Sequence, residues 1–314
     1  MNDEYLWNRE GEPDPEVARL EKLLAPVAYD PAAHKASYHR PSRRSLAVPV
    51  AIAAGLAVFG LFRAAKPPVM PETGWTVSMG GSEARAVRQG EWLATPAGST
   101  ASVESSSVGE LTIEPNSRLR LVESQDRRQR FDLQRGVIHA LIWAPPAQFA
   151  VDTPSARTVD LGCRYTLEMT ESGEGRLSVQ LGWVAFEAGA RESFIPAGAT
   201  CLTQPKTGPG TPFFDDADAR LIQGLAQFDS RGDSLETILG SARTRDALTL
   251  WHLLSRTRGE DRQRVYMRLA GLVKLPDAAN ESAVLKGDRA ALDAAWNALD
   301  LGDTAWWRTW KRNW

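Results

Sequence analysis

The sequence predicts a multidomain chain with a single transmembrane helix, an all-β domain folded as a sandwich or a solenoid-like stack, and a C-terminal all-α helical domain. Three observations predict this fold class. One uncharged apolar run stands near residue 50, short alternating segments separated by turn residues fill the middle, and helical periodicity follows to the end. With 314 residues, 43% of them hydrophobic and 24% charged, the composition is that of a folded protein with room for two ordinary domains.

We expect six segments along the chain. Their boundaries follow the changes in periodicity and the clusters of Pro, Gly and polar residues between them. A short cytoplasmic segment with one amphipathic helix covers residues 1–45, the transmembrane helix 46–62, a linker 63–74, the β domain 75–204, a hinge 205–213 and the helical domain 214–314.

The apolar run from Leu46 to Phe62 is expected to be an uncleaved membrane anchor. Its 17 residues would span about 26 Å as a helix, at the short end for a bilayer. A cleavable signal would begin within the first few residues, and a buried helix of a soluble domain is seldom apolar on all faces. The apolar residues of the anchor are Leu46, Val48, Val50, Ile52, Leu56, Val58, Phe59, Leu61 and Phe62.

Basic residues around the anchor predict its orientation. Four precede it and two follow it, and short segments rich in Lys and Arg stay in the cytoplasm. We therefore expect a cytoplasmic N-terminus, with residues 64–314 outside the inner membrane, in the periplasm where the host has one. The basic residues are Lys35, Arg40, Arg43 and Arg44 before the run and Arg63 and Lys66 after it.

The cytoplasmic segment contains one readable helix. Asp14 is a suitable N-cap, Pro15 fits the first helical position, and Leu20, Leu23 and Leu24 share one face. A helix of about three turns is marginal alone in water, so this leucine stripe is a candidate contact for a partner. A weakly ordered segment without a specific partner is the alternative.

Short alternating runs between residues 75 and 204 indicate an all-β domain. In LTIEPNSRLRL, Leu111 and Ile113 face one side, a turn at 115–117 intervenes, and Leu119 and Leu121 repeat the alternation. Similar runs follow at intervals of roughly ten to fifteen residues, which is typical of a sandwich or a stack of strands.

This β segment resembles the FecR-like domain over about residues 90–200. The motifs occur in the family's order, from GEWLAT and STASV through FDLQRGVI, FAVDTP, VDLGCRYTL and LSVQLGWVAFE to a closing PAGA turn. Where the family has Gly-Thr, this chain has Gly162-Cys163. The matching residues are Gly90, Leu93, Thr95, Ala101, Val103, Leu133, Gly136, Val137, Phe149, Val151, Thr153, Pro154, Val159, Gly162, Tyr165, Leu167, Gly182, Val184 and 196–199.

The resemblance implies a periplasmic sensor module of bacterial cell-surface signalling. On that basis we expect a membrane-anchored regulator that contacts protein partners outside and modulates a sigma factor or another cytoplasmic partner. A non-signalling envelope scaffold or binding protein, tethered to the inner membrane, is the alternative.

Motifs that carry chemistry are absent from the sequence, so we expect no enzyme activity and no cofactor. No G-x-S-x-G, H-E-x-x-H, C-x-x-C, P-loop or dinucleotide glycine motif occurs. Two cysteines and four scattered histidines predict no metal site, and a net charge of −2 gives no reason to expect nucleic acid as a partner. An envelope hydrolase would need carboxylates that converge from distant strands.

Cys163 and Cys201 have two interpretations. A disulfide would suit an extracytoplasmic domain and would close a loop of about 39 residues, which constrains the unfolded chain by about 4 kcal/mol. Two separate buried thiols are the alternative. Catalysis by either thiol is disfavoured, because the histidine of this segment, His139, falls on the polar face of a strand.

Helical periodicity predicts about five helices after residue 214. We expect Asp215 and Asp216 to open the first, Ser234 and Asp288 to cap later ones, and Pro276 to end a helix before it.

The C-terminal segment DTAWWRTWKRNW places Trp307, Trp310 and Trp314 on one helical face. These indoles are either a candidate contact for a partner or a membrane interface, or they close the core of the helical domain.

Overall fold

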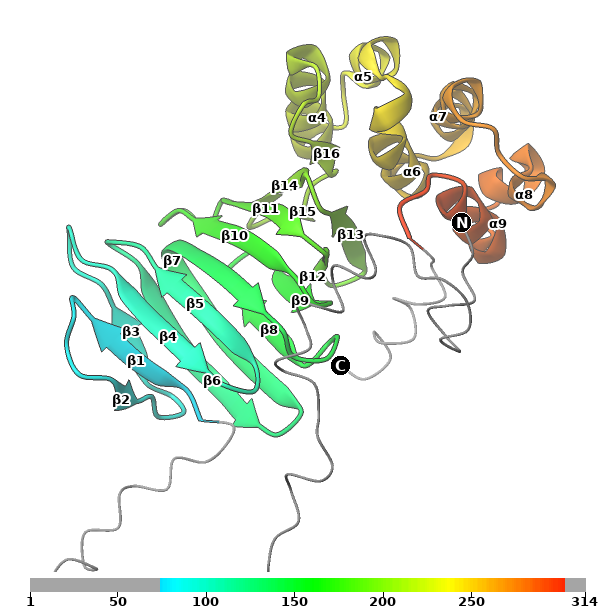
Figure 1. Cartoon of the computed structure of the whole chain (residues 1–314). Coiled ribbons are helices and arrows are strands. Elements are labelled where there is room, and N and C mark those ends of the chain that lie inside the picture. Colours follow the sequence, from blue (N-terminus) through cyan, green and yellow to red (C-terminus); the bar gives the residue numbers. More distant parts are fainter. Residues whose placement is uncertain (1–73, 303–314) are drawn as a thin grey trace, which may run out of the picture. The chain divides into compact units, whose positions relative to one another are not determined.

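The computed structural model describes residues 74–302 (Figure 1). The predicted cytoplasmic segment, the anchor at 46–62 and the C-terminal tryptophans lie outside these residues. Within 74–302, no helix has both the length and the apolar character needed to cross a bilayer. A large β structure comes first and helices follow, which is the order that the sequence predicts for this part of the chain.

Two β-sheets share one long strand, β7 (Arg128–Ile142). Sheet A runs in the order β2-β1-β4-β5-β7-β10-β11-β14, and the short strands β15 and β16 both pair with β14. Its other strands are β1 (Thr76–Met79), β2 (Arg85–Ala86), β4 (Ala101–Ser105), β5 (Gly109–Ile113), β10 (Arg164–Met169), β11 (Gly175–Leu181), β14 (Ala199–Gln204), β15 (Gly208–Pro209) and β16 (Phe213–Phe214).

Sheet B runs in the order β3-β6-β7-β8-β9-β12-β13. The pairing of β7 with β8 is parallel, and the other pairings described in both sheets are antiparallel. The strands of sheet B besides β7 are β3 (Trp92–Ala94), β6 (Arg118–Gln125), β8 (Phe149–Asp152), β9 (Arg157–Asp160), β12 (Trp183–Ala188) and β13 (Arg191–Pro196).

Strand β7 is long because it belongs to both sheets. Its first half pairs with β6 and β8, and its second half pairs with β5 and β10. Gly136 stands where the pairing changes, with φ of +95°, and a Cβ at this position would overlap Ser117. Glycine adopts such a backbone conformation readily and leaves room for the close approach. The glycine of FDLQRGVI therefore lets one strand pass from sheet B to sheet A.

Ser117 fixes this corner through side-chain hydrogen bonds. Its Oγ accepts from the backbone N–H of Val137 at 2.9 Å, and its own N–H donates to Thr95 Oγ1 at 3.0 Å. Thr95 Oγ1 donates in turn to the Glu114 carbonyl at 2.6 Å. The motifs GEWLAT and FDLQRGVI, which are far apart in the sequence, thus meet at the turn 114–117. That turn leads from β5 of sheet A to β6 of sheet B, so the two strands of LTIEPNSRLRL do not pair with each other.

A second pair of glycines marks another crossing between the sheets. The chain enters sheet A between β9 and β10, near Gly162, and returns to sheet B between β11 and β12, at Gly182. Gly182 has φ of +74°, and a Cβ there would overlap the carbonyl oxygen of Gly162. The two crossings therefore pack backbone against backbone.

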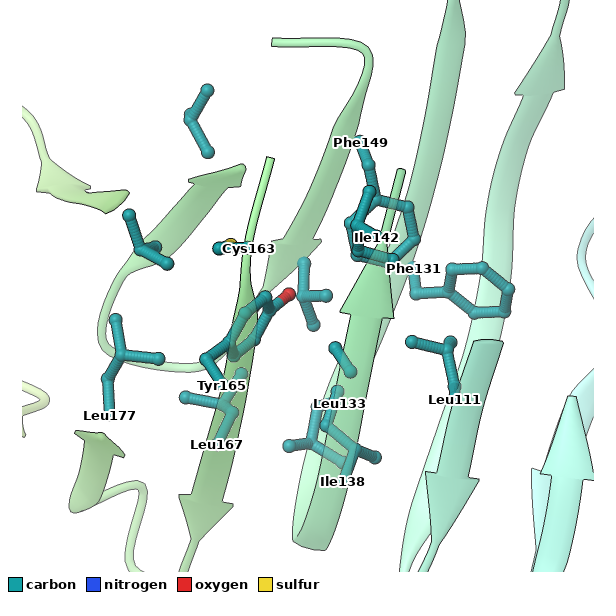
Figure 2. Close-up of a cluster of buried hydrophobic side chains, with 14 of the residues drawn as sticks. Leu111, Phe131, Leu133, Ile138, Ile142, Phe149, Cys163, Tyr165, Leu167 and Leu177 are labelled. Atoms are coloured by element: carbon teal, nitrogen blue, oxygen red, sulfur yellow. The ribbon is translucent and has the colours of Figure 1, made fainter. Parts of the chain in front are cut away.

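The inner faces of the two sheets enclose a continuous hydrophobic core. Trp75, Phe131 and Phe149 form an aromatic cluster with ring centroids 5.0–5.9 Å apart. Figure 2 shows Leu133 and Tyr165 in the same core. The residues that the sequence alternation assigns to one side are all at most 1% exposed, which confirms that prediction: Leu111, Ile113, Leu119 and Leu121.

Helices follow the sheets and pack around a second hydrophobic cluster. Leu248 and Trp296, however, belong to the core of the sheets. The helical region is therefore attached to the β structure through shared packing. Its helices are α4 (Ala219–Arg231), α5 (Leu235–Ser241), α6 (Ala247–Arg256), α7 (Gly259–Leu272), α8 (Glu281–Leu285) and α9 (Arg289–Asn297), with 3-10 turns η2 (Thr244–Asp246) and η3 (Asp277–Ala279).

The first helix begins later than predicted. Asp218 is the N-cap of α4, and its carboxylate accepts from the Arg220 N–H at 2.7 Å. Asp215 accepts instead from Thr200 Oγ1 at 2.7 Å, because β16 holds the preceding residues against β14. Asp216 lies near Arg243, which precedes the η2 turn, and near Arg245 within that turn, whereas Asp218 is the cap.

The other helix ends are mixed. Asp288 caps α9 as predicted, accepting from the Ala291 N–H at 3.0 Å. Ser234 stands at the start of α5 but makes no capping hydrogen bond, because its hydroxyl contacts Gln227.

The segment expected to be a hinge, 205–213, is packed along most of its length. Residues 208–213 are buried, and β15 within them pairs with β14. Thr211 and Pro212 contact helices α4 and α6 through hydrogen bonds. In the structure this segment is part of the joint between sheets and helices.

Candidate functional site

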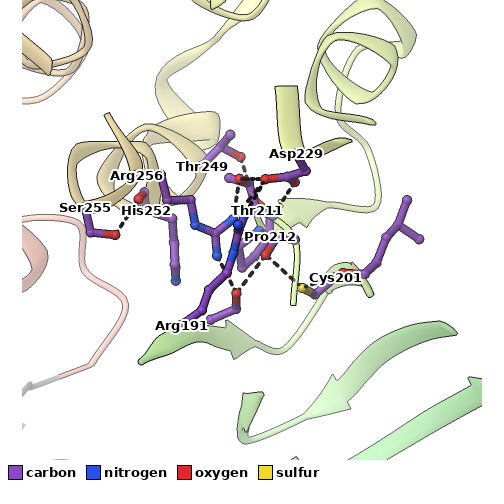
Figure 3. Close-up of polar contacts among 12 residues, drawn as sticks. Arg191, Cys201, Thr211, Pro212, Asp229, Thr249, His252, Ser255 and Arg256 are labelled. Carbon is purple, nitrogen blue, oxygen red and sulfur yellow. Dashed lines mark hydrogen bonds and ion pairs between the residues drawn. The ribbon is translucent and has the colours of Figure 1, made fainter. Parts of the chain in front are cut away.

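A buried polar cluster lies where the helices meet the sheets, and we call it the seam (Figure 3). Strand β13 supplies Arg191 and Ser193, the chain between β15 and β16 supplies Thr211, helix α4 supplies Asp229, and helix α6 ends with Arg256. An arginine in the last turn suits the negative end of the helix dipole. The seam is therefore built from four separate elements.

Asp229 is the acceptor at the centre of the seam. Its carboxylate accepts from the Thr211 N–H at 2.6 Å, from Thr211 Oγ1 at 2.9 Å and from Arg191 Nη2 at 2.8 Å. Arg256 Nη1 lies 3.4 Å from the same carboxylate. One carboxylate thus ties two arginines and the β15–β16 connection to helix α4.

Arg256 reaches across the seam from the helices to strand β13. Its Nη2 donates to Ser193 Oγ at 2.6 Å, and its Nη1 also donates to Thr211 Oγ1. The side chain is only 7% exposed, and this burial lowers the pKa of Arg256 to about 10, against the opposing effect of Asp229. The guanidinium therefore stays charged at neutral pH and depends on Asp229 for compensation.

His252 forms a second link between helix α6 and strand β13. Its Nδ1 donates to the Leu248 carbonyl at 2.8 Å, and its Nε2 accepts from the Phe194 N–H at 3.0 Å, which assigns the neutral tautomer. Burial, and then the nearby Arg256, lower the pKa of His252 to about 3. Both ring nitrogens are occupied by the backbone, so this histidine holds the fold together.

Four aromatic side chains continue the joint beside His252. The ring of Phe194 stacks on Trp183 at 5.2 Å and meets Trp296 edge-on at 5.4 Å, while Trp251 lies 4.7 Å from Trp296. The indole N–H of Trp251 donates to the Leu292 carbonyl at 2.8 Å. Phe194 and Trp251 also line a pocket.

A pocket of about 210 Å³ opens next to these rings. Phe194, Trp251 and Leu292 form apolar parts of its wall, and Ala190 and Glu192 of the β12–β13 hairpin form another side. His252 and Ser255 also border it, and both of their polar groups are hydrogen-bonded to the backbone. The pocket therefore combines aromatic walls with one acidic side chain.

A buried acid and thiol occupy the crossing between β9 and β10. The Cys163 thiol donates to the Asp160 carboxylate, which also accepts from the Gly162 N–H at 2.6 Å. Burial raises the pKa of Asp160 to about 7, although these hydrogen bonds act in the opposite direction. Burial, and then the charge of Asp160, raise the pKa of the Cys163 thiol well above its ordinary value. A neutral, buried thiol is a poor nucleophile.

Cys163 and Cys201 are separate, buried free thiols in the structure. The Cys201 thiol donates to the Gly210 carbonyl at 3.1 Å, and burial raises its pKa to about 12. His139 is exposed, as the strand alternation predicts, and lies 3.0 Å from Thr166 Oγ1 and 3.2 Å from Glu114. None of these groups forms a cluster with an accessible base among residues 74–302.

The remaining candidate residues lie outside the described part of the chain. They are the anchor residues at 46–62, the leucine stripe Leu20, Leu23 and Leu24, and the indoles Trp307, Trp310 and Trp314. Within residues 74–302, no group of three His, Cys, Asp or Glu side chains is arranged to hold a metal ion.

Sequence reasoning did not find the seam. Asp229 and Arg256 are 27 positions apart on different helices, and each looks like an ordinary charged residue of an amphipathic helix. The one local signal is the position of Arg256 at a helix end next to His252, which suits a helix terminus packed against another element.

Comparisons with known proteins identify the β part. The family model described as FecR protein matches residues 91–185, from the start of β3 into β12. A search of curated proteins gave no significant match. The seam residues and the pocket fall outside the matched segment.

Solved structures similar to this chain include two crystal structures of a protein assigned as an anti-sigma factor from Parabacteroides distasonis. Each is 15% identical with a TM-score of 0.35. The alignments cover 44% and 47% of this chain, and 65% and 74% of the two structures, so the chain spans less than two thirds of the first. From the family match and the motifs that meet at the sheet crossings, we conclude that this chain contains a FecR-like domain.

Proposed function

We propose that this protein is a membrane-anchored regulator with an extracytoplasmic FecR-like domain, and that it modulates a sigma factor. The observation that carries the proposal is the family match over residues 91–185. The uncharged run at 46–62, with more basic residues before it than after it, supports an anchor with a cytoplasmic N-terminus. Residues 1–45, with their leucine stripe, would then face the sigma factor, and residues 64–314 would face the periplasm.

Burial of the reactive groups supports a role in binding. Asp160, Cys163, Cys201 and His252 have shifted pKa values, yet each is at most 2% exposed and is hydrogen-bonded within the protein. Groups that serve catalysis must reach a substrate. In this reading the described residues present a rigid surface to a protein partner, and the response passes to the cytoplasm through the anchor.

Transcript profiling tests the regulatory role. A deletion strain is compared with strains that carry the full chain, a chain that lacks residues 1–45, or residues 74–314 attached to an unrelated anchor. We expect a defined set of transcripts to change on deletion and to return only with the full chain. If the third strain restores the normal state, or if no transcript changes, the protein acts as a tethered scaffold and the regulatory proposal is wrong.

Reporter fusions test the topology separately. A phosphatase that is active only in the periplasm is fused before Leu46 or after Trp314. Activity at the second position alone is expected, and activity before Leu46 would contradict the proposed orientation.

A further inference from the structure

We propose that the pocket beside Trp251 is a docking site for the C-terminal segment of the same chain, residues 303–314. The structure describes the chain up to Gly302, and the sequence DTAWWRTWKRNW follows. Four of these twelve residues are tryptophan and three are Arg or Lys. Three features favour this segment as the occupant: the position of Gly302, the size of the pocket and the charge of its wall.

The described chain ends close to the pocket wall. The Gly302 carbonyl accepts from Trp296 Nε1 at 2.9 Å, and a Cβ on Gly302 would lie 3.0 Å from the ring of Trp183. Trp183 stacks on Phe194, which lines the pocket. Gly302 thus contacts Trp183, and Trp183 contacts Phe194 of the pocket wall. The four residues that follow Gly302, up to Trp306, can span up to about 14 Å, so the first indole of the segment is within reach.

The pocket has the size and chemistry of an aromatic side-chain site. Its volume of about 210 Å³ exceeds the ~150 Å³ of an engineered cavity that binds benzene, so one indole ring fits. Trp251 is half-buried and lines the pocket, so its ring can make an aromatic contact that contributes beyond the buried area. At interfaces, aromatic side chains that fill such pockets often contribute most of the binding energy.

Charge favours this pocket over the other large groove near α9. That groove, of about 650 Å³, is lined by Leu299 and Leu301 but also by Arg245 and Lys274. Its two cations would repel the basic segment, whose side chains carry a net charge of +2 from Asp303, Arg308, Lys311 and Arg312. The pocket beside Trp251 has Glu192 in its wall, whereas the neighbouring His252 is neutral. The charge of a basic, tryptophan-rich peptide therefore complements the pocket beside Trp251 and not the groove near α9.

Peptide binding in trans tests the proposal on the detergent-solubilised full-length protein and on a variant that stops after Gly302. This variant keeps the carbonyl that Trp296 needs. The probe is a fluorescently labelled peptide of residues 303–314, followed by anisotropy. We expect it to bind the shortened chain, and to bind the full chain about a hundredfold more weakly, because a segment attached by a short tether competes at an effective concentration near millimolar.

Two matched substitutions in the shortened chain locate the site. Ala190→Trp places a large side chain in the hairpin turn that borders the pocket, and Ala97→Trp makes the same change in another exposed turn. Each alanine stands next to a glycine with positive φ. We expect Ala190→Trp to weaken peptide binding by about thirtyfold or more, because it fills the space for the incoming indole, and Ala97→Trp to leave it unchanged. Glu192→Gln should weaken it about two- to fivefold, and less so at high salt.

Three results would overturn the proposal. One is no binding by the shortened chain while its circular dichroism and melting temperature match those of the full chain. Another is equal binding by the Ala190→Trp and Ala97→Trp variants. The third is a dimer of the full chain, seen by sedimentation, that disappears on removal of residues 303–314, because the occupant would then be the segment of a second copy.

Discussion

Removing the carboxylate of Asp229 should destabilise the protein more than removing an exposed one. In Asp229→Ala the Arg256 guanidinium stays 7% exposed but loses its counter-ion, and the Thr211 N–H loses its acceptor. Breaking a buried ion pair from one side costs about 3–5 kcal/mol, because the remaining charge is left uncompensated. For a folded region of this size, about 2–4 °C per kcal/mol gives a fall in melting temperature of about 6–20 °C.

An exposed ion pair supplies the matched control. Arg135 and Glu171 lie 2.6 Å apart, but their side chains are 46% and 79% exposed. Water screens such a pair, so Glu171→Ala should cost about 0–1 kcal/mol. Thermal unfolding of both variants, followed by far-UV circular dichroism in the same buffer, measures the difference.

A double variant separates the charge from the packing. Asp229→Ala combined with Arg256→Met removes both buried charges and keeps an apolar stem at position 256. We expect it to recover at least half of the stability lost in Asp229→Ala, since a buried ion pair can be replaced by apolar side chains at little cost. Two results would refute this account of the buried charges in the seam. One is a melting temperature of Asp229→Ala within about 2 °C of that of Glu171→Ala, and the other is a double variant that is less stable than Asp229→Ala.

Three further predictions concern the β structure. Gly136→Ala should destabilise by about 2–4 kcal/mol in denaturant titrations, whereas Gly98→Ala, which also has positive φ but no atom within 4 Å of a new Cβ, should cost only about 1 kcal/mol; equal costs would contradict the close approach at Gly136. The pKa of Asp160 is raised from 3.8 to about 7, so this carboxyl keeps its proton in the folded chain where the unfolded chain loses it, and its contribution to stability falls as the pH rises from about 4 to about 7. Asp160→Asn should abolish that part of the pH dependence of the unfolding free energy, and an unchanged profile would exclude the shift. Cys163 and Cys201 should resist a thiol reagent in the native protein and both react after denaturation without reductant; labelling that needs reductant would mean a disulfide.

Local patterns in the sequence predicted which residues are buried but not which sheet they enter. Leu111 and Leu121 have the expected alternation, yet they belong to different sheets, because the turn between β5 and β6 crosses over. The alternation of apolar and polar residues distinguishes the inner face of a strand from its outer face, but it does not predict which strand pairs with it. For the same reason, the alternation does not predict the parallel pairing of β7 with β8.

Capping signals were reliable only where the neighbouring segment left them free. Asp288 caps α9, and its carboxylate accepts from the Ala291 N–H at 3.0 Å. Asp215 sits in the same kind of sequence but bonds to Thr200, since β16 extends the sheet up to that point. The start of α4 therefore depends on the pairing of β16 with β14, which local sequence propensity does not predict.

The seam has a consequence for how a signal could pass through this protein. Domains joined by a small polar contact usually move relative to each other. Here the contact buries Arg256 with Asp229, and Trp296 of the helices lies within the core of the sheets. Separating the two parts would break the contacts of Arg191 with Asp229 and of Arg256 with Ser193, and it would expose the large ring of Trp296. We therefore expect the two parts to move as one body.

The sheets in turn begin with a tightly held residue. Trp75 is 1% exposed, its indole donates to Gln129 Oε1 at 2.9 Å, and its ring meets Phe131 edge-on at 5.0 Å. In the proposed topology this residue follows the linker directly. A partner that binds the helical region would then act on the linker through a continuous path of packed side chains, from the seam through the sheets to Trp75. Rigid transmission of this kind needs no rearrangement inside the β structure, and the arrangement of the seam favours it over a mechanism in which the helices detach.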